Sequence, residues 1–140
     1  MWYTVKKLLE KREIKQLFIK EEKRLFNKLI HYADTYFSKF IRTRDHEKWC
    51  ITKNLDTCQN KIDDCCHWIS RSFYSHRRDE YNCYWGCASC NSYHKQEHWM
   101  EFTRIQTHKH WIERVDKQMF ERNKIKPTIE ELIEIIKKYK

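Results

Sequence analysis

The chain contains very few residues of the kinds that interrupt helices or enter membranes. Glycine and proline occur once each in 140 residues, so the segments outside the cysteine-rich middle carry almost no turn signals and are helical candidates. No apolar run approaches the roughly 18 residues that a membrane span needs. The N-terminal segment also lacks an uninterrupted apolar stretch of the signal-peptide type. The sequence therefore predicts a cytoplasmic protein without a membrane partner.

The cysteine content excludes a complete set of disulfides, because the chain has seven cysteines and seven is odd. In a cytoplasmic chain such cysteines indicate metal binding or catalysis before disulfides. All of them lie between residues 50 and 90, which marks this stretch as the metal-bearing part. The charge balance is also uneven, with 29 Lys and Arg against 20 Asp and Glu. A basic surplus favours a polyanionic partner, nucleic acid before an anionic membrane surface.

Apolar periodicity divides the chain into helical flanks and a mixed middle. Apolar residues recur at steps of three and four from 25 to 41, which predicts a helix packed on a domain or a partner. The more charged residues upstream predict a solvated arm or a dimer-forming helix. Residues 99–120 are again helical in pattern, and Thr128 with Glu131 predicts a capping box at the start of a last helix. Only residues 67–70 and 81–85 suggest strands, joined as a hairpin by a basic loop.

These patterns predict an α+β fold that is mostly helical, with a small zinc-stapled motif between long helices. We expect an N-terminal helical arm over 1–44, a zinc-bearing motif over 45–98 and C-terminal helices over 99–140, forming one compact domain overall. A dimer formed through the N-terminal helix fits this layout.

Cys87 and Cys90 form a C-x2-C pair, the spacing that lets two thiolates from one tight turn share a tetrahedral zinc ion. A structural zinc needs a second pair from elsewhere in the chain, and Cys50 with Cys58 are the candidates. Their separation is wider than usual, and either Cys65 or Cys66 is an alternative to Cys58. Bound zinc would supply much of the stability of so small a motif.

Several stretches resemble the phage recombination endonucleases of the lambda NinG (Rap) family. They are "FNKLIHYADTYFSKFIRTRD", "DCCHWISRS" and "RRDEYNCYWGCASCN", and together they cover roughly residues 20 to 105. The resemblance implies a ββα-metal, HNH-like nuclease motif of treble-clef type, acting in the host cytoplasm if the protein is phage-encoded. The chain departs from the family in lacking an N-terminal zinc ribbon, in its wider first cysteine pair and in lacking a glycine after "CN".

The layout is also similar to that of zinc-bearing resolvases of the endonuclease VII type. In those an Asp lies three residues before the catalytic His, and an Asn follows the last zinc cysteine. Asp64, His67 and Asn91 match these positions, so the resemblance implies that His67 is a general base and that Asp64 and Asn91 hold a catalytic Mg²⁺ or Mn²⁺. Asn82 matches the middle Asn of the HNH pattern, which braces the loop that carries the His.

Other residues remain open as alternatives or additions to this site. Asp63 is an alternative to Asp64 at the metal, Asn91 could instead cap a helix, and His94, Glu97 and His98 could flank the metal. Basic side chains on the hairpin and on the following helix are expected to contact DNA phosphates: Arg71, Arg77, Arg78, Lys95 and Arg104.

Together these interpretations predict an HNH-type endonuclease that hydrolyses phosphodiesters in branched DNA such as Holliday junctions or D-loops. The preference for branched substrates rests on the resemblance alone. The alternatives are an HNH nickase of ordinary duplex DNA and a non-catalytic, zinc-stabilised nucleic-acid-binding module.

Overall fold

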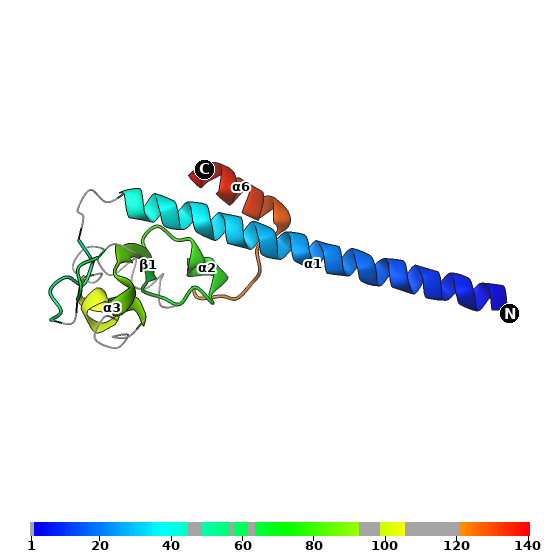
Figure 1. Cartoon of the computed structure of the whole chain (residues 1–140), viewed down its shortest axis with the longest axis horizontal. Coiled ribbons are helices and arrows are strands. Elements are labelled where there is room, and N and C mark those ends of the chain that lie inside the picture. The colour runs from blue at the N-terminus through cyan, green and yellow to red at the C-terminus, as the bar shows by residue number, and fades with distance from the viewer. Residues whose placement is uncertain (1, 45–48, 57, 62–63, 93–98, 106–120) are drawn as a thin grey trace.

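The computed structural model describes residues 2–44, 49–56, 58–61, 64–92, 99–105 and 121–140. A long helix passes over a small body and extends well beyond it, and a short C-terminal helix lies beside the long one (Figure 1). Residues 99–105 form a further helical segment. The architecture is α+β and mostly helical, as predicted. In chain order the elements are α1 (Trp2–Arg44), β1 (Asp64–His67), α2 (Tyr74–Arg77), β2 (Cys83–Gly86), α3 (Ala88–Ser92) and α6 (Ile129–Tyr139).

The two halves of α1 lie in different surroundings. Its C-terminal half packs on the body through Ala33, Phe37 and Ile41, which follow one another at steps of four and are at most 2% exposed. In the N-terminal half the side chains of Ile14 and Phe18 are 66% and 72% exposed. The C-terminal half of the helical arm predicted for 1–44 is therefore part of the core of the body. Among the described residues, no helix is both long enough and apolar enough to cross a bilayer.

The last helix, α6, begins at the predicted capping box. The Thr128 hydroxyl accepts a hydrogen bond from the Glu131 amide, and the Glu131 carboxylate accepts one from the Thr128 amide. At the other end of α6, Tyr139 packs its ring against Phe37 and Phe40 of α1. These contacts hold α6 along the C-terminal half of α1.

The hairpin consists of β1 and β2, which are antiparallel with His67 opposite Cys83. Both strands are shifted from their predicted positions: β1 occupies 64–67 rather than 67–70, and β2 occupies 83–86 rather than 81–85. The ladder stops after His67 because the Asn82 side chain, rather than a second strand, bonds the backbone of Ile69. The connection that was predicted as an open basic loop contains the short helix α2.

The hairpin separates two small cores. One face packs Cys66 and Trp68 against the helical segment 99–105, where Phe102 is fully buried. The Trp68 indole also donates a hydrogen bond of 2.9 Å to the Thr103 hydroxyl. The other face meets α1, where Cys83 packs with Phe37 and Ile41. Side chains on the two faces of one hairpin therefore lie in different environments.

Candidate functional site

Four cysteine thiols gather at the end of the hairpin that leads into α3. The Sγ atoms of these residues lie within 4.8 Å of one another, close enough to hold a metal ion such as zinc. This knuckle cluster consists of Cys50, Cys58, Cys87 and Cys90. These are the four cysteines predicted as zinc ligands, and Cys58 rather than Cys65 or Cys66 of β1 completes the group.

Backbone amides surround the sulfurs of the knuckle cluster. The Cys87 amide lies 3.3 Å from Cys50 Sγ, the Cys90 amide 3.4 Å from Cys87 Sγ and the Asn60 amide 3.2 Å from Cys58 Sγ. Burial opposes ionisation of Cys87, but the hydrogen bonds from Cys90 and other neighbours outweigh it and lower the pKa of the Cys87 thiol to about 7. At Cys87 the N–H donors thus favour the thiolate, the form that a metal binds, whereas burial raises the pKa of Cys58 to about 11 and raises that of Cys90 as well.

The wide first cysteine pair closes into a compact loop through local hydrogen bonds. The amides of Lys53, Leu55 and Cys58 each bond a carbonyl three residues earlier. Asn60 then adopts a left-handed conformation with φ of 53° and accepts a hydrogen bond from the Cys50 amide on its Oδ1 atom. Asn is one of the few residues that tolerates this conformation. The seven intervening residues thus bring Cys58 back beside Cys50.

The single glycine of the chain allows the hairpin to approach the knuckle cluster closely. A Cβ atom at Gly86 would lie 2.7 Å from Cys66 Sγ and 3.3 Å from Cys50 Sγ. The first distance is shorter than any ordinary contact, so a side chain at this position would displace one of the buried thiols.

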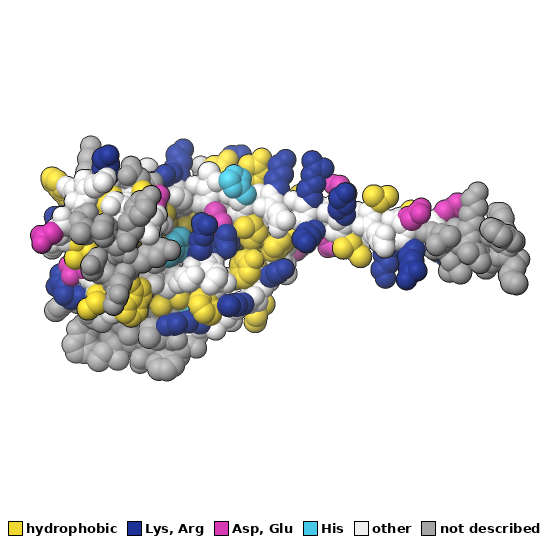
Figure 2. Space-filling model, turned by 60° about the horizontal axis from the view of Figure 1, so that its bottom comes forward, with side chains coloured by type: hydrophobic (Ala, Val, Ile, Leu, Met, Phe, Trp, Pro, Cys, Tyr) yellow, Lys and Arg dark blue, Asp and Glu magenta, His cyan; other side chains and the backbone are white. Residues whose placement is uncertain are grey.

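The predicted catalytic residues meet in a cavity of about 550 Å³ between the hairpin, α1 and α3. Asp64 and His67 come from β1 and Asn91 from α3, and Asn91 Nδ2 donates a hydrogen bond of 3.1 Å to Asp64 Oδ2. Figure 2 shows a histidine, an acidic side chain and basic side chains meeting where the body joins α1. The structure therefore brings together three residues that the sequence separates by up to 27 positions.

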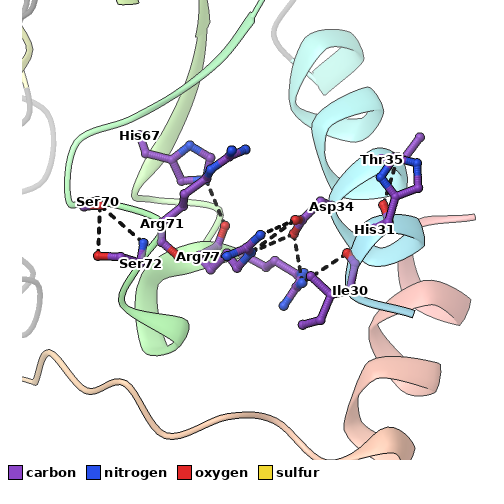
Figure 3. Close-up of polar contacts among 10 residues, drawn as sticks. Ile30, His31, Asp34, Thr35, His67, Ser70, Arg71, Ser72 and Arg77 are labelled. Atoms are coloured by element: carbon purple, nitrogen blue, oxygen red, sulfur yellow. Dashed lines mark hydrogen bonds and ion pairs between the residues drawn. The ribbon is translucent and has the colours of Figure 1, made fainter. Parts of the chain in front are cut away.

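His67 is held in one orientation by the backbone of α2. Its Nε2 atom lies 2.9 Å from the Arg77 carbonyl oxygen, and because a carbonyl only accepts, Nε2 carries the proton (Figure 3). The basic lone pair is then on Nδ1. Burial lowers the pKa of His67, although the Arg77 carbonyl works in the opposite direction. The imidazole is consequently neutral at neutral pH.

Asn82 acts on the site through the backbone. It is fully buried, and its amide bonds the N–H and carbonyl of Ile69 at 2.7 and 2.9 Å and the carbonyl of His76 at 2.9 Å. These bonds connect the segment after His67 to α2, which supplies the carbonyl that orients the imidazole. Asn82 does not line the cavity, so it is a positioning residue for the loop.

Arg77 and Arg78, which were predicted to contact phosphates, are both ion-paired with Asp34 of α1. Arg77 donates from both Nε and Nη2 to the Asp34 carboxylate (Figure 3), and Arg78 Nη2 lies 2.8 Å from Asp34 Oδ1. The Arg78 side chain is only 6% exposed. Both residues therefore fix α2 to α1. The sequence contained a signal for this role, since Asp34 is a carboxylate within the apolar stripe that includes Ala33 and Phe37.

The other basic candidates have different positions. Arg71 is exposed and lines the cavity, which fits a phosphate contact. Arg104 is exposed at the helical segment 99–105 and is paired with Glu101. Lys95 lies outside the described residues, and so do the alternatives Asp63, His94, Glu97 and His98.

Compared with models of protein families, with curated proteins and with solved structures, the chain finds no match.

Proposed function

We propose that the protein is a metal-dependent DNA endonuclease of the HNH type, in which β1, β2 and α3 form the ββα-metal motif. The observation that carries this proposal is the cavity in which Asp64, His67 and Asn91 meet. A neutral imidazole beside hard oxygen ligands is the combination that hydrolysis of a phosphodiester by water requires.

In this proposal His67 is the general base. Donation from Nε2 to the Arg77 carbonyl leaves Nδ1 to accept a proton from the attacking water. Because burial lowers the pKa of the ring, the base is unprotonated at neutral pH. The Arg77 carbonyl also stabilises the imidazolium that forms, since the N–H bonded to it becomes more acidic and a stronger donor.

Asp64 and Asn91 would hold a divalent cation such as Mg²⁺ or Mn²⁺. A carboxylate and an amide oxygen are the hard ligands that these ions prefer. Asn91 turns its Nδ2 atom toward Asp64, and a half-turn of the amide brings its oxygen to the same place. The chemistry that such an ion supplies is stabilisation of the charge that develops on the departing 3′ oxygen.

A shallow groove of about 480 Å³ along α1 offers a path for the DNA backbone. It shares Asp34, Arg71 and Arg77 with the cavity and extends along α1 to His31 and Arg42. Lys and Arg side chains follow α1 away from this junction (Figure 2). Phosphate contacts of this kind are independent of sequence and weaken as salt rises. The proposed preference for branched recombination intermediates rests on the resemblance to the phage endonucleases.

Single-turnover cleavage tests the proposal on a labelled four-way junction and on a duplex of the same sequence, with Mg²⁺ or Mn²⁺. His67→Ala should keep its fold, its zinc and its DNA binding and should lose about 10²- to 10⁴-fold in rate, the usual cost of removing a general base. Asp64→Ala and Asn91→Ala should also lose cleavage and should recover part of it at higher Mn²⁺. Asp56→Ala, which removes an exposed carboxylate from the knuckle loop, should cut at the wild-type rate.

The outcomes separate the rival functions. A folded His67→Ala variant that cuts at the wild-type rate would disprove the nuclease site. A wild-type protein that binds DNA and cuts neither substrate is a zinc-stabilised binding module, and equal cutting of junction and duplex indicates a nickase without branch preference.

A further inference from the structure

A second group of metal-ligating side chains lies on the other face of the hairpin. Cys65 and His67 are two residues apart on β1 and therefore share one face of the strand, and Cys83 lies directly opposite His67 on β2. One ligand atom from each of these residues lies within 4.8 Å of the other two. No part of the nuclease proposal uses the two thiols.

The spacing of this second cluster is close to that of a zinc site. Zinc binds sulfur at about 2.3 Å and nitrogen at about 2.0 Å, so two sulfurs and one nitrogen in a tetrahedron lie about 3.5 to 3.8 Å from one another. The ligand atoms lie within 4.8 Å of one another, so each separation exceeds the tetrahedral value by at most about 1.0 to 1.3 Å, a gap that side-chain rotations can close. His67 already has the second contact that is typical of a metal-bound imidazole, because its Nε2 donates to a backbone carbonyl.

The chemistry of the second cluster differs from that of Asp64 and Asn91. Two thiols and an imidazole favour Zn²⁺ or another soft or borderline cation over Mg²⁺. Cys65 and His67 line the cavity, while Cys83 closes the site from the buried side. The cavity leaves room for water as a fourth ligand, and binding would release the thiol protons to solvent.

We infer that Cys65, His67 and Cys83 form a second, inhibitory zinc site that removes His67 from catalysis. This inference rests on the proposed function, in which Nδ1 of His67 accepts the proton from water. Nδ1 has only one lone pair. An imidazole that uses this lone pair to coordinate zinc can no longer act as a base. Zinc at the knuckle cluster then stabilises the fold, while zinc at the second cluster stops cleavage.

Cobalt titration of the full chain tests the site without reference to activity. Protein with zinc in the knuckle cluster should bind a further equivalent of Co²⁺ and show a thiolate-to-cobalt charge-transfer band. Cys65→Ala and Cys83→Ala should lose the band. Cys66→Ala is the matched control, because it removes a neighbouring thiol that points to the opposite core, and it should keep the band. Because Cys83 is buried, circular dichroism and the zinc content of the knuckle cluster check that its variant is folded. Cys65 is partly exposed, and its variant provides an independent test of the site.

The cleavage assay then tests inhibition. Added zinc should slow the wild-type enzyme and Cys66→Ala by about 10²-fold or more, the cost of losing a general base, and Cys65→Ala should lose this response. The inference is overturned if the wild type shows no charge-transfer band, if Cys65→Ala keeps the band, or if cobalt binds while zinc leaves cleavage unchanged. A chain that binds cobalt through these residues and cleaves nothing would disprove the proposed nuclease and leave the metal site in place.

Discussion

The two sides of the β1–β2 hairpin use the same kinds of side chain in opposite ways. On the knuckle side, four thiols are surrounded by backbone amides and by a loop that closes over them. On the side facing α1, two thiols and an imidazole adjoin a cavity that reaches solvent. A closed set of four ligands can only stabilise, whereas an open set of three leaves a position for water or substrate. The enclosed set of ligands therefore suits a structural metal, and the set beside the cavity suits a metal that solvent can reach.

The largest expected effect comes from breaking the knuckle side. Cys87→Ser or Cys90→Ser should unfold or aggregate the protein, because a metal held by the knuckle cluster would supply much of the stability of so small a body. Strong chelators should act in the same way. Circular dichroism would measure the fold and elemental analysis the zinc content of each variant and of the chelator-treated protein. Cys65→Ser is the control and should keep its fold and about one zinc per chain. Soluble, folded protein that contains no zinc would contradict this prediction.

A second large effect on stability is expected from the ion pairs that fix α2, beside the cavity, to α1. Asp34→Ala leaves Arg77 and the nearly buried Arg78 without their carboxylate. Unpaired charges at such sites are costly, so we expect a loss of about 2 to 4 kcal/mol in the free energy of unfolding. Glu134→Ala removes an exposed helical pair with Lys137 and should cost less than about 0.5 kcal/mol. Urea denaturation of zinc-saturated protein measures both, and equal losses would show that Asp34 does not fix α2 to α1.

The sequence predicted features that depend on local contacts and missed features that depend on distant ones. The C-x2-C pair and the Thr128 capping box lie within a few residues and were confirmed, because one turn of chain determines their geometry. The roles of Arg77 and Arg78 depend on a carboxylate of α1 more than 40 positions away, and no local pattern encodes that distance.

The strands show the same limitation. Trp68 and Ile69 have the aromatic and β-branched character of strand residues, yet they turn into the core beyond the end of β1. The end of the ladder is set by the buried amide of Asn82 from the far side of the hairpin. The sequence identified the residues of the cavity through a family pattern, but the shared face of Cys65 and Cys83 follows only from the observed register.

A moderate effect should follow from crowding the hairpin where it touches the knuckle cluster. Gly86→Ala places a methyl group 2.7 Å from Cys66 Sγ, and overpacking of this kind costs about 1 to 3 kcal/mol. Cys66→Ala removes the obstructing sulfur, so the double variant should be more stable than the sum of the single losses predicts. A double-mutant cycle of urea denaturation measures the coupling. Strict additivity would mean that the strain falls on Cys50 instead.

The smallest effect concerns the contact between the hairpin connection and α6, and it depends on pH. Glu80 accepts hydrogen bonds of 2.8 Å from Lys138 and from the Tyr139 hydroxyl. The Lys138 bond, opposed by burial and aided by Tyr139, lowers the pKa of the Glu80 carboxyl below its usual range. A depressed acid pKa contributes stability above the unfolded value of about 4.3, and that stability is lost as the pH falls through the folded value.

Glu80→Gln should therefore be less stable than the wild type at pH 7 and should approach it in stability below about pH 4. The difference at pH 7 should stay below about 1 kcal/mol, because the Lys138 side chain is 62% exposed and solvent screens the pair. Effects of acid on the rest of the protein act on both proteins alike and cancel in the comparison. Urea denaturation as a function of pH measures the difference, and hydrogen exchange of the α6 amides shows whether the loss is local undocking. A difference that does not change with pH would mean that Glu80 acts as a neutral acceptor and that its charge adds nothing to the contact with α6.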